Sequence, residues 1–338
     1  MNNIFVYCEQ KDNGSVAEVS KELLSKGKKL AQQLNVKLEA VLLGFQLDKA
    51  IDELHYFGVD TIHTLDDQRL FPYRSMPHAH VVQGLFEAEK PEIVLFGATS
   101  VGRDLAPHIA SALRCGLTAD CTSLEIGNHT DNKKNITYDN LLYQIRPAFG
   151  GNIIATIVNP ETRPQMATVR EGVMKLETLP KNNPVIKPIN ITIPTAIDEL
   201  VQIIDRQVEE PKVDLKGARI IVAGGYGMGN RENFNHLFQL ADVLNAEVGA
   251  TRAAVDAGFC EHERQIGQTG VTVRPKLYIA CGISGSVQHR AGMDQSAKII
   301  SINTDVNAPI NAIADYTLVG DVMQVLPKLI TYYKKHAK

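Results

Sequence analysis

The sequence predicts an α/β protein made of two doubly wound domains, each with a mainly parallel sheet. Its 338 residues suit about two domains at roughly 150 residues each. In both halves, short β-prone segments alternate with amphipathic helical segments, the pattern of parallel sheets covered by helices. Four prolines within residues 180–194 would interrupt any helix, which marks a connection between the halves near 180–212. We therefore expect a first domain over residues 1–207 and a second over residues 208–338.

In the first half, Ser15 and Glu18 have the spacing of a capping box, and the helix that they would open carries apolar residues from Val16 to Leu34 on one face. Strands are expected at residues 4–7, 37–43, 61–65 and 92–96, and further helices at 48–57, 75–89 and 104–113. Three later β-prone stretches are expected to complete or flank the first sheet, at residues 136–146, 152–158 and 165–170.

After a helix-like stretch at residues 197–208, a second alternating series begins. Its strands are expected at 220–223, 276–280 and 298–302, and its helices at 231–244 and 322–335. This series predicts the second doubly wound sheet.

Composition excludes several classes of function. Lys+Arg 35 against Asp+Glu 38 gives a net charge of −3, so no nucleic-acid partner is expected. The apolar runs are far shorter than the ~20 residues of a membrane span, and none is expected. Five scattered cysteines, never spaced C-x-x-C, argue against a disulfide framework and against a metal site. No export signal precedes the first strand, so we expect a cytoplasmic protein. The sequence contains no tryptophan, so a flat ligand cannot stack on an indole ring.

A glycine-rich turn (Gly-Gly-Tyr-Gly-Met-Gly, residues 224–229) lies between the predicted strand 220–223 and the next helix. Glycines there let backbone approach a phosphate, and a helix N-terminus favours an anion. The spacing departs from G-x-G-x-x-G, and no acidic residue clearly follows at the next strand end. Dinucleotide binding and a tight strand-to-helix turn are therefore equally supported.

Three loops rich in Gly, Ser, Thr and Gln follow in the second half, at residues 249–258, 265–270 and 281–289. Loops at the carboxyl ends of parallel strands converge on the ligand crevice of such a domain. Taken singly, Arg252 reads as a surface cation and His289 as a capping or core histidine. A ligand-free scaffold is disfavoured, because packing alone hardly explains three such loops.

These segments, in this order, closely resemble the alpha subunit of electron transfer flavoproteins. The resemblance is dense over residues 217–330, where it extends through 302–305, 308–310 and 314–321. It is thinner over residues 92–158, where segments 97–107, 116–121 and 146–152 carry it. It implies an N-terminal domain like the adenine-nucleotide α-hydrolases, which packs against a partner subunit, and a C-terminal domain that binds FAD noncovalently.

Positions that match the family imply where FAD lies. Arg252 would be the cation beside the flavin ring, the Thr269 hydroxyl would lie near N5, and His289 would face the C2 carbonyl. Reduction places negative charge on this N1/C2=O region, so a guanidinium and an imidazole there would stabilise it. Tyr226 stands where many relatives have arginine, and Arg231 is a candidate replacement. The implied FAD contacts are Tyr226, Thr251, Arg252, Ile266, Gly267, Gln268, Thr269, Ser284, Gly285, Ser286, Val287, Gln288, His289, Asn303, Asp321 and Val322.

In the first domain, residues 97–104 read either as the relic of a phosphate loop or as a structural helix start, and the helix start is favoured. The resemblance implies that a nucleotide, AMP or a second FAD, is carried by the family's beta subunit instead.

The resemblance implies an electron carrier that works as a heterodimer with the beta subunit, with NADH oxidation only in that complex. A conventional carrier shuttles single electrons from dehydrogenases, whereas a bifurcating one oxidises NADH and splits the electrons between an acyl-CoA dehydrogenase and ferredoxin or flavodoxin. Similarity to sequences of anaerobes favours bifurcation. The alternative from another class is a self-contained NAD-linked dehydrogenase, which needs a proton-transfer residue and an acidic ribose ligand that the sequence does not identify.

Overall fold

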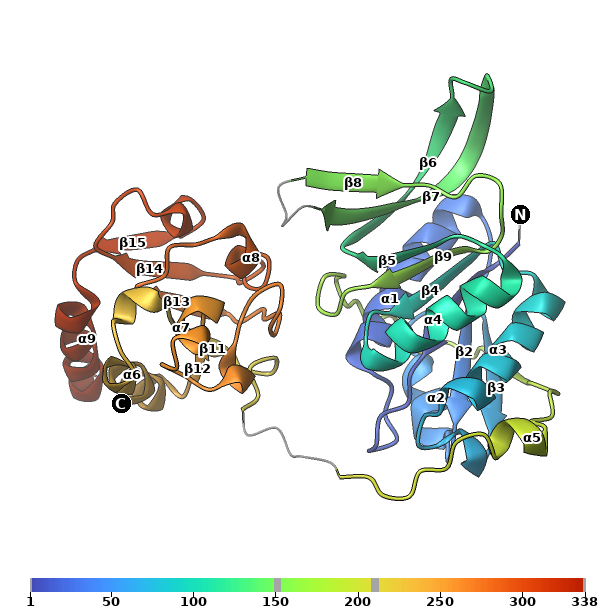
Figure 1. The fold of residues 1–338 in the computed structure, drawn as a ribbon, viewed down its shortest axis with the longest axis horizontal. Coiled ribbons are helices and arrows are strands. Elements are labelled where there is room, and N and C mark those ends of the chain that lie inside the picture. The colour runs from blue at the N-terminus through green and yellow to red at the C-terminus, as the bar shows by residue number, and fades with distance from the viewer. Residues whose placement is uncertain (1, 149–152, 208–212, 337–338) are drawn as a thin grey trace. The chain divides into compact units, whose positions relative to one another are not determined.

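The computed structural model describes residues 2–148, 153–207 and 213–336, which form two compact units (Figure 1). The first unit runs to Arg206 and the second begins at Gln207. The predicted limit between residues 207 and 208 lies beside 208–212, which are outside the described residues, so the domain limits stay a prediction. Residues 149–152 of the segment 146–152 also lie outside them.

The first unit is built on a seven-stranded sheet in which every pairing is parallel. The strand order is β10-β3-β2-β1-β4-β9-β5. The strands are β1 (Ile4–Cys8), β2 (Leu38–Gly44), β3 (Thr61–Asp66), β4 (Ile93–Gly97), β5 (Leu117–Cys121), β9 (Gln165–Val169) and β10 (Val185–Pro188). The order reverses at β1, which pairs with β2 on one side and β4 on the other.

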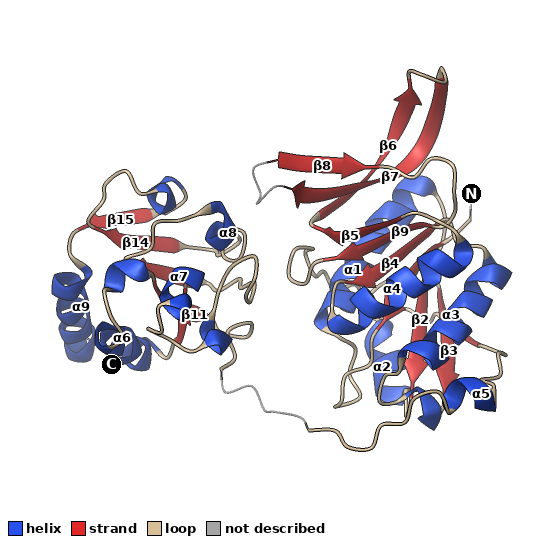
Figure 2. Ribbon diagram, viewed as in Figure 1, coloured by secondary structure: helices blue, strands red, loops and turns tan. Residues whose placement is uncertain are grey.

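Helices cover both faces of this sheet (Figure 2). The helices are α1 (Glu18–Leu34), α2 (Asp48–Leu54), α3 (Ser75–Glu89), α4 (Ser100–Leu113) and the short α5 (Thr195–Asp198). Apolar residues of α1 and α2 share one buried cluster with one sheet face, and those of α3 and α4 share another with the opposite face. The predicted doubly wound class is confirmed for this unit.

Two local predictions for the first unit are wrong. The helix α1 begins at Glu18 with Ala17 as its N-cap, because the Ser15 hydroxyl donates to Asn13 Oδ1 (2.6 Å) instead of capping the helix. The predicted helix at 197–208 ends at Asp198. Arg74 donates to the carbonyls of Asp198 (2.5 Å) and Val201 (2.9 Å), so the backbone there is held by a side chain of α3's N-cap rather than by helical bonds.

The proline-rich stretch belongs to the first unit rather than to a free connection. Residues 185–188 form the edge strand β10, which pairs in parallel with β3. An edge strand tolerates proline because one side of it makes no ladder bonds. Of the later β-prone stretches, one becomes β9 in the main sheet and the others flank it in a separate antiparallel sheet of β6 (Ser123–Asp131), β7 (Ile136–Ala148) and β8 (Ile153–Ile157).

The second unit is a five-stranded parallel sheet in the order β12-β11-β13-β14-β15. Its strands are β11 (Ile220–Gly224), β12 (Glu247–Ala250), β13 (Leu277–Cys281), β14 (Ile299–Asn303) and β15 (Tyr316–Val319). The two edge strands, β12 and β15, were not predicted, because each has only four residues. The strand β11 pairs with β12 on one side and with β13 on the other, so the chain winds in opposite directions from β11. The ligand crevice of an open α/β sheet is expected at such a point.

The two faces of the second sheet are covered differently. The helices α6 (Asn235–Leu244) and α9 (Val322–His336) contact each other and pack on one face. The other face is covered by loop residues such as Ile266, Ile283 and Ile310. The short helices α7 (Arg252–Asp256) and α8 (Val287–Arg290) follow β12 and β13 at their carboxyl ends. Across the part of the chain that the structure describes, no helix combines the length and apolar character needed to cross a bilayer.

Candidate functional site

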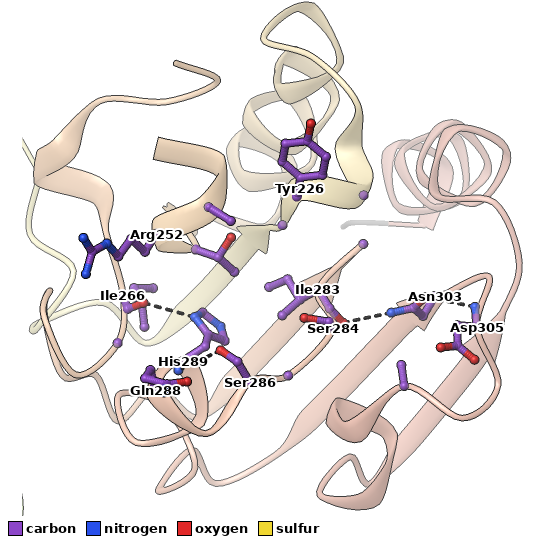
Figure 3. A pocket seen from close by; sticks show the side chains of 18 of the residues that line it. Tyr226, Arg252, Ile266, Ile283, Ser284, Ser286, Gln288, His289, Asn303 and Asp305 are labelled. Atoms are coloured by element: carbon purple, nitrogen blue, oxygen red, sulfur yellow. Dashed lines mark hydrogen bonds between the residues drawn. The ribbon is translucent and has the colours of Figure 1, made fainter. Parts of the chain in front are cut away.

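A cavity of about 510 Å³ lies at the carboxyl ends of the second unit's strands (Figure 3). Its size is typical of a pocket for a small molecule or cofactor. It is lined by the loops that follow β11, β12, β13 and β14, by the 266–269 loop and by the start of α9. All of the predicted contact residues line it except Val287, the first residue of α8. Their individual contacts with FAD stay predictions.

Arg252 supplies the positive charge at one end of the cavity. It is the first residue of α7, and Thr251 caps that helix by accepting from the Ala254 amide (3.4 Å). The guanidinium pairs with Asp256, with Nε 3.3 Å from Oδ2, and both side chains are about two-thirds exposed, at 67% and 64%. Because both side chains are exposed to water, the ion pair with Asp256 holds Arg252 weakly. The guanidinium is therefore able to turn toward a bound anion.

His289 lines the same end but is almost fully buried, with 4% of it exposed. Its Nδ1 lies 3.0 Å from the Ile266 carbonyl oxygen, and its Nε2 lies 3.0 Å from the Tyr278 hydroxyl. Burial lowers the pKa of His289 from 6.5 to about 4, although the bond to Ile266 opposes that shift, so the ring is neutral at pH 7. The residue is thus both a core histidine and a lining residue.

The 266–269 loop is tied to its neighbours by backbone hydrogen bonds. Ile266 N donates to the Ala250 carbonyl (2.9 Å), and Gln268 N donates to the Gln288 carbonyl (2.8 Å). The Thr269 hydroxyl accepts from Gln265 Nε2 (3.0 Å). This loop therefore joins the end of β12 to helix α8 and presents its polar groups to the cavity.

The other end of the cavity is acidic and is braced by Asn303. The Asn303 amide donates to the Ile283 carbonyl (2.8 Å) and accepts from the Asp305 amide (3.0 Å), so it joins the loops after β13 and β14. Asp321 accepts from Met323 N (2.9 Å) at the start of α9. Carboxylates at this end suit the hydroxyl groups of a ribose, because they can only accept hydrogen bonds.

The glycine-rich turn packs against the loop after β13. Gly225 N donates to the Cys281 carbonyl (2.9 Å) and Gly227 N donates to the Gly282 carbonyl (3.0 Å). A Cβ at Gly225 would fall on the Gly282 carbonyl oxygen. These glycines serve close backbone contact and their amides are engaged, which favours the tight-turn interpretation over a phosphate cradle. Tyr226 is 65% exposed and stacks on Phe259, with ring centroids 5.6 Å apart.

Arg231 does not line the cavity; it pairs with Glu261 (3.1 Å) and is largely exposed. Sequence reasoning missed several lining residues that lie beside predicted ones. These are Gly225, Gly227, Ala253, Gly282, Ile283, Thr304, Asp305 and Ala308. Asp305 had a usable signal, because it follows a strand predicted to end at residue 302.

The segment at residues 97–104 in the first unit forms a structural helix start. The Thr99 hydroxyl accepts from Gly102 N (2.9 Å) and donates to Glu9 Oε1 (2.7 Å). Glu9 follows β1 and is mostly buried, which raises its pKa from 4.5 to about 7. A Cβ at Gly102 would fall on the Gly97 carbonyl oxygen, so this glycine allows α4 to lie close to β4.

The cavity residues fit FAD. The pocket is elongated between Arg252 at one end and Asp305 at the other, which suits a flavin ring beside the cation and ribose hydroxyls beside the carboxylates (Figure 3). Ser284 and Ser286 lie between them. They flank Gly285, where a Cβ would fall on the backbone nitrogen of Ile310. No group of three or more His, Cys, Asp or Glu side chains suited to a metal ion occurs among the residues with a described position.

Comparisons with known proteins agree with this fit. The family model for the electron transfer flavoprotein domain matches residues 4–192, and that for the electron transfer flavoprotein FAD-binding domain matches residues 214–294. The alpha subunits of electron transfer flavoproteins from Thermoanaerobacterium thermosaccharolyticum and Clostridium acetobutylicum are each 45% identical over 98% of this chain, and the matches cover 98% and 96% of those proteins.

A further relative comes from Anaerotignum propionicum and is named acryloyl-CoA reductase electron transfer subunit beta. It is 38% identical over 98% of this chain, and the match covers 96% of that protein. The matched FAD-binding domain contains most of the cavity lining and supports FAD as the cofactor. The chain therefore belongs to the electron transfer flavoprotein family, as an alpha subunit with the family's FAD-binding domain in its second unit.

Proposed function

We propose that this chain carries FAD in the second-unit cavity and passes electrons as one subunit of a heterodimer with an electron transfer flavoprotein beta subunit. The observation that supports this most directly is that most of the residues lining the cavity belong to the matched FAD-binding domain. FAD supplies the electron-transfer chemistry through its isoalloxazine ring. The protein supplies binding, orientation and local charge.

Each end of the cavity has a separate task in this proposal. Arg252 places a positive charge beside the ring, where it favours the reduced and more negative state. The carboxylates of Asp305 and Asp321 accept hydrogen bonds from the adenosine ribose, and Asn303 joins the loop that carries Asp305 to the loop after β13. The buried residues Ile266 and Gly267 of the 266–269 loop limit access of water to one side of the ring.

Within this function, we infer that the complex bifurcates electrons. NADH would reduce it, and the electrons would divide between an acyl-CoA dehydrogenase and ferredoxin or flavodoxin. The relative named as an acryloyl-CoA reductase electron transfer subunit supports an acyl-CoA dehydrogenase as one partner. The second candidate is a conventional carrier, in which the beta subunit holds AMP and single electrons arrive from dehydrogenases.

Flavin counting tests the proposal. The chain should be co-expressed with an electron transfer flavoprotein beta subunit from the same organism, and the purified complex should be analysed for FAD and AMP. Two FAD per heterodimer with reduction by NADH supports bifurcation, whereas one FAD with one AMP supports the conventional carrier. A complex without any flavin would contradict both.

A self-contained NAD-linked dehydrogenase has less support. Gly225 and Gly227 in the glycine-rich turn already donate their amides to the loop after β13, so they offer no cradle for a pyrophosphate. Turnover of a small substrate with NAD by the chain purified alone would overturn our preference.

A further inference from the structure

The central part of the cavity carries hydroxyl groups and no lysine or arginine. Among the described residues that line the cavity, Arg252 alone is a lysine or arginine, and it lies at the end proposed for the flavin. Asp305 and Asp321 place carboxylates at the other end. The pyrophosphate of FAD is an anion that joins the flavin half to the adenosine half, so it would lie between these ends. The proposed site therefore has to hold an anion at a place where the lining offers it no cation.

Ser284 and Ser286 are the side-chain donors in this central part. Both residues are exposed and line the cavity. The Ser284 backbone is held in place, because its carbonyl accepts from Ile310 N (3.1 Å). The Ser286 hydroxyl accepts from the His289 amide (3.4 Å) and can still donate its own hydrogen to a ligand. A phosphate oxygen between these serines would meet neutral donors on a fixed backbone.

Tyr226 borders the same part of the cavity from the glycine-rich turn. Its ring is stacked on Phe259, with an angle of 22° between the two planes. The Tyr226 hydroxyl points away from Ser284 (Figure 3). An aromatic ring that is turned aside thus occupies the position from which a long basic side chain could reach the pyrophosphate.

Arg231 is the described cation nearest to this turn along the chain, and it is paired elsewhere. Its Nη2 lies 3.1 Å from Glu261 Oε1, and it does not line the cavity. Both side chains of this pair are largely exposed, at 72% and 55%, so the pair is weak. Arg231 is therefore the alternative source of positive charge that an experiment has to exclude.

We propose that this chain holds the FAD pyrophosphate with neutral donors, Ser284 and Ser286 among them, and that Tyr226 keeps basic charge out of the centre of the cavity. This inference rests on the proposed function and deepens it. Salt screens the attraction between exposed opposite charges, whereas a hydrogen bond from a neutral donor depends much less on salt. The affinity for FAD is therefore nearly independent of ionic strength, and Tyr226 determines that property.

The first measurement uses the wild-type heterodimer after removal of its FAD. The dissociation constant for oxidised FAD, whose ring brings no charge to Arg252, should be measured by flavin fluorescence. Between about 50 mM and about 500 mM NaCl we expect it to change by less than about threefold. A larger loss of affinity at high salt would overturn the proposal. A wild-type complex that never holds FAD would instead contradict the proposed function, so the two failures are distinguishable.

The second measurement adds the missing charge. Tyr226→Arg is compared with Tyr226→Gln, which also removes the ring but adds no charge, and an exposed position tolerates both. At low salt we expect Tyr226→Arg to bind FAD about five- to tenfold more tightly than Tyr226→Gln, the size of one hydrogen bond to a charged group less the cost of ordering the side chain. At high salt this advantage should shrink to less than about twofold. Equal affinities at low salt would overturn the proposal.

The third measurement tests Arg231 directly. Arg231→Gln should bind FAD as the wild type does at both salt concentrations, because its guanidinium pairs with Glu261 and not with the ligand. Glu261→Gln is the matched control, since it breaks the same pair and keeps the arginine. Weaker FAD binding at low salt in Arg231→Gln, without weakening in Glu261→Gln, would show that Arg231 supplies the charge and would overturn the proposal.

Discussion

Arg252 Nε lies 3.3 Å from Oδ2 of Asp256, one turn further along α7, although Arg252 also lines the cavity. Among the described residues that line the cavity, Arg252 is the one arginine or lysine. Its charge is therefore partly neutralised by Asp256, which does not line the cavity. Because both side chains are exposed, the pair is weak and sensitive to salt. Asp256 thus moderates the charge that Arg252 brings to the proposed flavin position.

Replacing Arg252 with alanine should make the bound flavin harder to reduce. Loss of a positive charge near the ring disfavours added negative charge, and each tenfold change in a one-electron equilibrium corresponds to about 59 mV. We expect the midpoint potential in the heterodimer to fall by about 20–60 mV, measured by spectroelectrochemical titration. Arg231→Ala is the control, because Arg231 is also exposed but does not line the cavity. An unchanged potential in Arg252→Ala would refute the role of Arg252.

Replacing Asp256 with asparagine should have the opposite effect. The charge of Arg252 would no longer be neutralised, so the midpoint potential should rise by about 10–30 mV at low ionic strength and by less in high salt. Glu261→Gln, which removes the partner of Arg231, should leave the potential unchanged. Equal effects of the two variants would show that the change is not local.

Gly285 should tolerate alanine much less well than Gly258 does. Both residues have left-handed backbone, with φ of +86° and +75°. A Cβ at Gly258 meets nothing within 4 Å, whereas one at Gly285 would fall on the backbone nitrogen of Ile310. Gly258→Ala should cost about 1–2 kcal/mol of stability from backbone strain alone, and Gly285→Ala about 1–3 kcal/mol more from the clash.

Urea unfolding and FAD affinity measure the difference between these glycine variants. Only Gly285→Ala should also weaken FAD binding, because Gly285 lines the cavity. Equal loss of stability in the two variants would mean that the Ile310 contact is unimportant.

Replacing Glu9 with glutamine should stabilise the protein above neutral pH. Burial raises the pKa of Glu9 from 4.5 to about 7, so between these values the folded state binds more protons than the unfolded state and stability falls as pH rises. The glutamine side chain retains an oxygen that can accept from the Thr99 hydroxyl. The advantage of the variant should grow by about 2–3 kcal/mol between pH 5 and pH 8.

Urea unfolding of both proteins at several pH values checks this. The buried His78 and His289 have pKa values lowered to about 4, so they reduce stability as pH falls below 6.5, but they do so equally in both proteins. Stability curves that stay parallel from pH 5 to pH 8 would contradict the raised pKa of Glu9.

Much of the fold could be predicted because the relevant information is local. The helix predicted at 75–89 is found as Ser75–Glu89, and the strand predicted at 298–302 is found as Ile299–Asn303. Regular spacing of apolar residues along the sequence identifies such helices and strands. The helix predicted at 197–208 was wrong because a distant residue, Arg74, binds the carbonyls of Asp198 and Val201. Residues 185–188 of the proline-rich stretch likewise form an edge strand because they pair with β3, a strand distant in the sequence.

The sequence alone determined the α/β class, the family, and the set of loops that surround the cavity, because motifs and alternation are properties of neighbouring residues. Only the tertiary structure decided how those residues act. It showed that the amides of Gly225 and Gly227 serve loop packing, that Arg252 pairs with Asp256, and that His289 has partners on both ring nitrogens. Hydrogen bonds between segments distant in sequence fix these roles, and the order of residues along the chain does not record them.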